Sequence, residues 1–254
     1  MGFMVVIAAA GIYFWKFSPP AAPHKPESGP TETSRKPARP LTARDYLQRG
    51  NAAKYAQEKI LLYSEAIEID PNYAMAYNNR GIAYCDRNEY ELALKDYNKA
   101  IAIRPDYAIA YNNRGRLYYE KTDYEKALAD INKVIELEPN EARSYNIRGN
   151  INSRQKNYEA AINDYTKAIT LKPDDHITYC NRGNAYFTKD DYEKALIDFN
   201  KALAIKPDYA NAYYRRALLY KKTGDYDKAR ADYDKAASLH PRWLDAAFPL
   251  PGGK

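Results

Sequence analysis

The chain has 254 residues, a formal net charge of +6 and an unusually large number of tyrosines, 26. The excess charge is small for this length and lies partly in the N-terminal tail, whereas a nucleic-acid-binding surface should be strongly basic and clustered. We therefore expect no nucleic-acid partner.

The first feature along the chain is an apolar run from Gly2 to Trp15, which is followed by Lys16. A helix of about fifteen residues spans about 22 Å, less than the roughly 30 Å of a hydrocarbon core. No Lys or Arg precedes Lys16, so the basic n-region of a cleaved signal peptide is missing. We interpret residues 1–17 as an uncleaved single-pass membrane anchor. An atypical signal peptide and a buried helix are the alternatives.

Residues 18–40 are rich in Pro, Ser and Thr. This composition cannot pack a core and predicts a semi-extended spacer that holds the following domain away from the bilayer. The basic residues after the anchor favour a cytoplasmic domain by the positive-inside rule. If the apolar run acts as a signal, the domain lies instead in the periplasm or a lumen.

From Ala74 onward the sequence repeats every 34 residues. We number the first residue of each copy as position 1. The copies are residues 74–107, 108–141, 142–175, 176–209 and 210–243, preceded by a divergent copy at 41–73 and followed by a tail at 244–254. A fixed period of this length indicates a stacked array in which each unit needs its neighbours to complete a core.

Each copy predicts two helices, which in the first full copy cover about Ala74–Arg87 and Tyr90–Ile103, with Pro105 ending the second. Gly81 and the alanines of the second helix allow the two helices to approach closely. The sequence therefore predicts an all-α fold, an α-α superhelical solenoid of helix hairpins.

The pattern Tyr77, Gly81, Tyr84, Ala93, Tyr97, Ala100, Pro105 resembles the tetratricopeptide repeat, with Tyr where that family often has Trp and Phe. The resemblance covers residues 74–243, and the divergent copy fits it if three residues are missing from its inter-helix turn. The family's usual Leu at position 7 is here Arg.

This recurrent arginine falls in the apolar sector of the first helix, where an unpaired guanidinium would be costly. Position 23 of the second helix is Asp in every full copy. We therefore predict an Arg–Asp ladder, within or between neighbouring copies. Cys85 and Cys180 lie three copies apart, too far for a disulfide.

The resemblance implies that positions 2, 5, 6, 9 and 12 of the first helices line a concave groove that receives an extended peptide or a partner helix. Asparagine dominates these positions, and its amide can pair with both groups of a peptide backbone. The alternative is that the asparagines only solvate an exposed helix face. The candidate groove residues are Asn78, Asn79, Asn112, Asn113, Arg116, Arg143, Asn146, Asn150, Asn181, Asn184, Tyr214 and Arg215.

Asparagine at position 6 resembles the asparagine ladder of O-linked N-acetylglucosamine transferases, although Ile147 and Arg215 interrupt it. The family's carboxylate clamp is matched at Asn150, Asn181 and Arg215, but asparagines occupy the positions of its two lysines. A chaperone-tail ligand is therefore disfavoured. The basic side chains in the groove still favour an acidic partner.

Signs of catalysis are missing, because the three histidines are isolated and neither a phosphate-binding loop nor a nucleophile elbow is present. We expect no enzyme activity, no cofactor and no metal. After Pro241, residues such as Trp243, Leu244 and Phe248 are expected to cover the last copy; otherwise its apolar edge favours self-association.

The sequence thus predicts a membrane-tethered scaffold or adaptor for a protein or peptide partner. A structural accessory subunit of an envelope or secretion assembly is the alternative, and an RNA-binding helical repeat is a weaker one, because the groove lacks a repeated base-reading pair.

Overall fold

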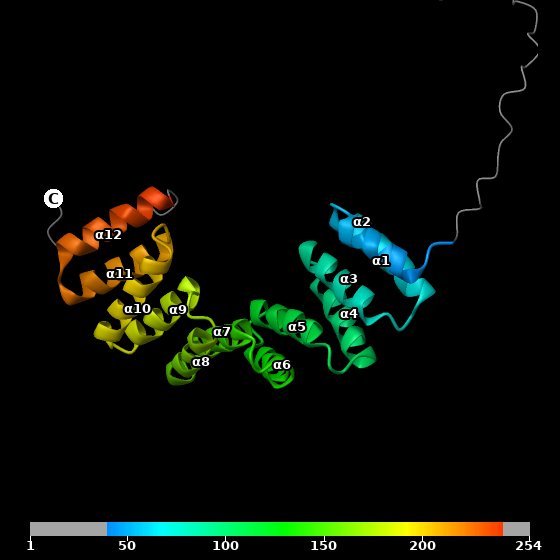
Figure 1. The fold of residues 1–254 in the computed structure, drawn as a ribbon, viewed down its shortest axis with the longest axis horizontal. Coiled ribbons are helices and arrows are strands. Elements are labelled where there is room, and N and C mark those ends of the chain that lie inside the picture. The colour runs from blue at the N-terminus through cyan, green and yellow to red at the C-terminus, as the bar shows by residue number, and fades with distance from the viewer. Residues whose placement is uncertain (1–39, 241–254) are drawn as a thin grey trace, which may run out of the picture. The chain divides into compact units, whose positions relative to one another are not determined.

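The computed structural model describes residues 40–240, which form twelve α-helices (Figure 1). In chain order they are α1 (Ala43–Ala52), α2 (Ala56–Ile69), α3 (Ala74–Asp86), α4 (Tyr90–Ile103), α5 (Ala108–Glu120), α6 (Tyr124–Leu137), α7 (Ala142–Arg154), α8 (Tyr158–Leu171), α9 (His176–Thr188), α10 (Tyr192–Ile205), α11 (Ala210–Thr223) and α12 (Tyr226–Leu239). Consecutive helices pair as hairpins, and each hairpin packs on the next, as α2 does on α3 and α8 on α9. The expected all-α superhelix of helix hairpins is confirmed.

The turn between the two helices of a repeat is set by one residue with a left-handed backbone. Asn88 (φ 62°), Thr122 (60°), Lys156 (64°), Asp190 (60°) and Gly224 (85°) occupy the same position of successive repeats. Asn, Asp and Gly adopt this conformation readily, whereas the β-branched Thr does so at a cost. Each of the five full repeats thus reverses at one left-handed residue, whereas the α1–α2 turn of the divergent repeat has none.

Within a hairpin, a glycine on the first helix faces a large side chain on the second. A Cβ atom on Gly81 would lie 2.7 Å from Tyr97, and one on Gly149 would lie 2.6 Å from Tyr165. Real Cβ contacts are not this short, so the close approach inferred for the glycine at position 8 is confirmed. The aromatic ring fills the space that a side chain would take.

The divergent first repeat differs from our expectation. Its first helix, α1, has 10 residues, compared with 13 in α3, while three residues still separate α1 from α2. The three-residue deletion in this repeat therefore shortens the end of α1 and leaves the inter-helix turn at its usual length. A capping box begins α1, in which Thr42 accepts a hydrogen bond from the Asp45 amide and the Asp45 carboxylate accepts from the Thr42 amide.

The predicted Arg–Asp ladder is present, and each ion pair forms within one repeat. In all five full repeats the Arg at position 7 contacts the Asp at position 23 at 2.6–2.8 Å. Each aspartate is only 2–7% exposed. In the divergent repeat, where the corresponding second-helix residue is Leu62, Arg49 is exposed.

Each arginine of the ladder also reaches the preceding repeat. Its Nη1 donates, over 2.5–3.0 Å, to a side chain at position 25 of the previous second helix, as Arg182 does to Thr166. Tyrosine rings lie beside the guanidinium, for example Tyr179 at 5.7 Å and Tyr186 at 5.9 Å from Arg182. The ladder therefore joins neighbouring hairpins as well as the helices of one hairpin.

Several expectations concern residues outside the described range. The anchor at 1–17, nearly all of the linker and the tail residues Trp243, Leu244 and Phe248 are among them. Within residues 40–240, no helix is both long and apolar enough for a membrane span. The expectation that Cys85 and Cys180 do not form a bridge is confirmed, because both are free.

Candidate functional site

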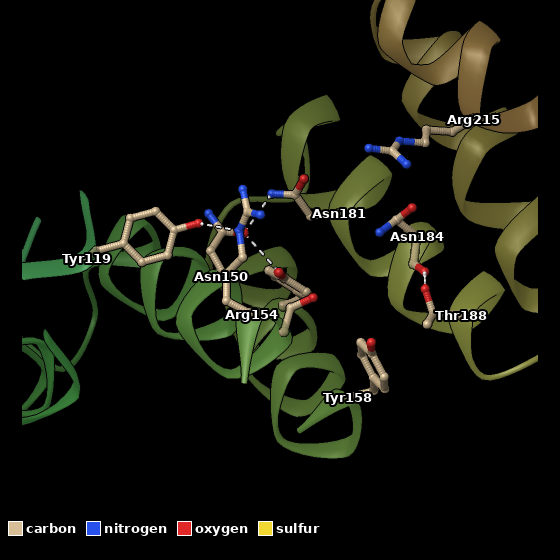
Figure 2. A pocket seen from close by; sticks show the side chains of 10 residues that line it. Tyr119, Asn150, Arg154, Tyr158, Asn181, Asn184, Thr188 and Arg215 are labelled. Carbon is tan, nitrogen blue, oxygen red and sulfur yellow. Dashed lines mark hydrogen bonds between the residues drawn. The ribbon is translucent and has the colours of Figure 1, made fainter. Parts of the chain in front are cut away.

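A polar cavity of about 440 Å³ opens where α5, α7, α9 and α11 come together (Figure 2). Ten residues line it, none of them acidic: Tyr119, Asn150, Ser153, Arg154, Tyr158, Tyr165, Asn181, Asn184, Thr188 and Arg215. We call this cavity the polar pocket. Most of its lining comes from first helices, the elements that the sequence predicted to line the groove.

Two guanidinium groups give the polar pocket its positive charge. Arg154, the last residue of α7, donates from Nε to the hydroxyl of Tyr119 on α5 over 3.1 Å, and this hydrogen bond raises the pKa of Arg154. Arg215 projects from α11. In the described part of the chain neither arginine forms a salt bridge with a carboxylate, so both can neutralise an anion.

Asn150 is held in place at the wall of the polar pocket by three hydrogen bonds. Its Oδ1 accepts from the Tyr165 hydroxyl at 2.8 Å and from Asn181 Nδ2 at 3.1 Å. Its Nδ2 donates to Asn146 Oδ1 at 3.3 Å. The amide carbonyl is thus used twice, and one N–H of Asn150 is left for a ligand.

The hydrogen bonds continue from Asn146 into the next repeat. Asn146 Nδ2 donates to the buried Thr178 hydroxyl at a distance of 2.5 Å. That hydroxyl in turn donates to the Asp175 carboxylate, also at 2.5 Å. Asp175 also accepts from the Ile177 amide as the N-cap of α9. This chain of donors fixes the amides of α7 relative to α9, so part of the asparagine pattern serves to align repeats.

The junction of the first two repeats has the same arrangement. Asn51 Oδ1 accepts from the Tyr63 hydroxyl at 2.9 Å and from Asn79 Nδ2 at 3.0 Å. At the next junction Asn113 donates instead to Asn78, which itself donates to Asn79. The asparagine at position 6 therefore bonds to the preceding repeat wherever it occurs.

At the junction of the third and fourth repeats an apolar contact stands where the asparagine bond would be, beside the Arg154–Tyr119 and Arg148–Asn132 hydrogen bonds. Ile131 replaces the second-helix tyrosine, and Ile147, at position 6, packs against the cluster that contains it. A small pocket of about 130 Å³ lies here, lined by Arg116, Tyr119, Glu120, Ile147 and Asn150. We call it the apolar pocket. It shares Tyr119 and Asn150 with the polar pocket.

The predicted groove residues are not equally accessible. Asn78 is only 1% exposed, so it supports its neighbours and cannot contact a ligand directly; Cys180, also assigned to the groove positions, is 2% exposed. Asn79, Asn113 and Tyr214 are half-buried. Asn112 and the exposed Arg143 line a separate pocket, which also contains Glu138 and Glu141. The polar pocket combines Asn150, Asn181, Asn184 and Arg215 of the predicted set, and Asn146 lies directly behind it.

Sequence reasoning missed Arg154 and Thr188, both at position 13. Position 13 follows position 9 by four residues and so lies on the same helix face, a spacing that could have identified them. The sequence did place Tyr119 at a groove position, but its bond to Arg154 joins two different repeats, which pack through α6 and α7. No metal-binding group of His, Cys, Asp and Glu occurs in residues 40–240.

Sequence comparison gives a consistent result. A profile described as TPR repeat matches residues 83–121, 149–190 and 183–224, and two profiles described as tetratricopeptide repeat match 108–141, 210–242 and 62–95. Together they cover most of the chain. The chain is a tetratricopeptide repeat protein. Proteins built from these repeats are typically non-catalytic binding scaffolds. No curated protein matches the sequence of this tetratricopeptide repeat protein.

Several solved structures share the fold. YrrB, described as a TPR protein with an unusual peptide-binding site, has a TM-score of 0.58 and 24% identity, covering 70% of this chain and 92% of YrrB. The pilF protein of Pseudomonas aeruginosa has a TM-score of 0.65 and 23% identity over 78% of this chain and 89% of its own. A tetratricopeptide repeat protein from Parabacteroides merdae has a TM-score of 0.60 and 25% identity, covering 81% of each chain.

Proposed function

We propose that this protein is a membrane-tethered adaptor that binds an extended segment of a protein partner along its first helices, without catalysis. The observation that carries the proposal is the polar pocket, where Arg154 and Arg215 project without a carboxylate partner in the described chain. A site that concentrates positive charge in this way favours an acidic segment.

The amides around the polar pocket support a peptide as the ligand. Asn181 uses one N–H to bond Asn150, and the second N–H and the carbonyl are available for a peptide backbone. Asn150 and Asn146 are pre-oriented by their own hydrogen bonds, which lowers the entropic cost of binding. YrrB is called a peptide-binding TPR protein, which agrees with a similar use of the fold here.

Membrane tethering rests on the apolar segment at 1–17 and the proline-rich linker that follows. The basic residues after the segment favour a cytoplasmic repeat domain. Membrane fractionation of the full chain and of a chain starting at residue 41, with protease protection, tests both points. Soluble recovery of the full chain under conditions that release only peripheral proteins would rule out the anchor.

Affinity capture from detergent-solubilised native membranes tests the adaptor function. The variant Arg154→Gln/Arg215→Gln should lose the captured partner. The control Lys167→Gln/Lys201→Gln removes the same charge from exposed positions of the second helices α8 and α10 and should retain it. Loss with both variants would indicate a general effect of charge.

The structural accessory subunit is the second candidate, and two side chains of the second helices favour it. Leu61 is 59% exposed and Ile197 is 60% exposed, away from the groove positions. If the partner survives Arg154→Gln/Arg215→Gln but is lost when Leu61 and Ile197 are changed to Ser, the interface lies on the second helices and the accessory role is correct.

A further inference from the structure

The two interruptions of the asparagine ladder lie in adjoining pockets. Position 6 is Ile147 in the fourth repeat and Arg215 in the sixth, and asparagine elsewhere in the second to fifth repeats. Ile147 lines the apolar pocket, whereas Arg215 lines the polar pocket. Departures from an otherwise regular pattern are therefore located where the groove has cavities for side chains.

The apolar pocket suits an aliphatic side chain. Its volume of about 130 Å³ equals the liquid volume of about four waters, enough for a Val or Leu side chain. Ile147 packs beside a buried cluster of aliphatic residues, and Tyr119 provides an aromatic wall. Arg116 and Glu120 line this pocket with opposite charges, so their side chains give it no net positive charge to attract an anion.

The polar pocket has the opposite preference. Arg154 and Arg215 both contribute to it, and Figure 2 shows Asn184 between Arg215 and Thr188. Thr188 uses its hydroxyl to donate to the Asn184 backbone carbonyl at 2.9 Å, so the Asn184 amide and the two guanidiniums are the groups presented to a ligand. These donors can bind a carboxylate, whereas an aliphatic side chain would leave them without hydrogen-bond acceptors.

The distance between the pockets limits the spacing of the ligand's side chains. Both pockets contain Tyr119 and Asn150, so only one wall separates them. In an extended peptide, residues i and i+2 point to the same side and are about 6.6 Å apart. Adjacent residues point to opposite sides, so residues i and i+2 are the nearest pair whose side chains can enter both pockets.

We propose that Tyr119 separates two side-chain subsites, and that the partner segment carries an aliphatic and an acidic residue two positions apart. This inference rests on the proposed adaptor function and adds which side chains the partner presents. Tyr119 is a positioning residue in this site, because its hydroxyl orients Arg154 while its ring forms the wall between the subsites.

The test is fluorescence polarisation with fluorescein-labelled peptides that contain a Val-Ser-Asp core, or its reverse, between Ser-Gly flanks. In the better-binding order, replacing Val with Ser or Asp with Asn should each weaken binding about tenfold. Placing Val and Asp next to each other should have a similar effect. Weak binding that follows peptide charge alone, or no binding by any peptide, would overturn the two-subsite proposal.

Variants assign the two preferences to the two pockets. Ile147→Asn, which restores the ladder residue, should remove the preference for Val over Ser but keep that for Asp over Asn. Tyr119→Phe should remove the preference for Asp over Asn, because the bond that orients Arg154 is lost. It should keep the preference for Val over Ser, because the aromatic ring is retained. If far-UV circular dichroism shows that Ile147→Asn does not fold, Ile147→Thr replaces it.

Capture of the native partner separates this inference from the adaptor function. If the partner is lost with Arg154→Gln/Arg215→Gln but retained with Ile147→Asn, and the peptides show no preference for Val, the adaptor function stands and the two-subsite proposal is wrong. If Ile147→Asn also loses the partner while remaining folded, the apolar subsite is part of the interface.

Discussion

Replacing Asp198 with Ala should strongly destabilise the protein, because it leaves the Arg182 guanidinium without its main partner. Asp198 is 2% exposed and accepts two hydrogen bonds from Arg182, at 2.8 and 2.9 Å. Removing one member of a fully buried ion pair costs about 3–5 kcal/mol. The Arg182 side chain retains 17% exposure and its bond to Thr166, so we expect the low end, about 3 kcal/mol.

Urea unfolding followed by circular dichroism measures this loss, which corresponds to a fall in the midpoint of about 1 M for an m-value near 3 kcal/mol/M. The double variant Arg182→Leu/Asp198→Ala should recover at least half of the loss, because it leaves no buried charge. Glu136→Gln is the control, since its pair with Lys133 is solvent-exposed and its loss should leave the unfolding midpoint nearly unchanged. A loss below about 1 kcal/mol for Asp198→Ala, or simple additivity in the double variant, would refute the ladder as a source of stability.

Three further predictions concern the packing of single repeats. Gly183→Ala should lower the free energy of unfolding by about 1 kcal/mol, because its Cβ would lie 2.8 Å from Phe199 and this crowding outweighs the gain in helix propensity; an increase in stability would contradict the close packing. Thr122→Gly should raise stability by up to about 1 kcal/mol by relieving a β-branched residue at φ 60°, and a loss would show that the turn is not strained. Burial raises the pKa of the Cys180 thiol to about 12, so Cys180 should react slowly with iodoacetamide between pH 7 and 9 and faster only on unfolding, whereas equal labelling of Cys85 and Cys180 in the native protein would contradict the burial.

Properties that repeat with the 34-residue period could be predicted from the sequence. The arginine at position 7 falls in an apolar sector, and one acid recurs at a fixed distance from it, so the pairing follows from helix geometry and the cost of a buried charge. The helix boundaries followed in the same way, with α4 beginning at Tyr90 and ending at Ile103 as expected. The end of the shortened α1 could not be predicted, because the sequence shows how many residues are missing but not where the helix ends.

The details of the site depend on contacts between different repeats. The helical spacing placed Asn78 in the groove, but the packing of Asn113 and Asn79 around it leaves it 1% exposed. Arg154 joins the polar pocket because Tyr119, 35 residues earlier, holds its guanidinium. Neither relation is a property of one repeat, so a pattern read within one copy could not predict them.

Site-specific photo-crosslinking tests the central claim, that the first-helix face holds a partner polypeptide, most directly. Benzoylphenylalanine is placed at Asn184, in the polar pocket, or at Ile197, a 60% exposed position on the second helix α10, and full-length protein is irradiated in native membranes. We predict a covalent adduct with a partner polypeptide from Asn184 and none from Ile197. Adducts from Ile197 alone, or the same adducts from both positions, would contradict the account.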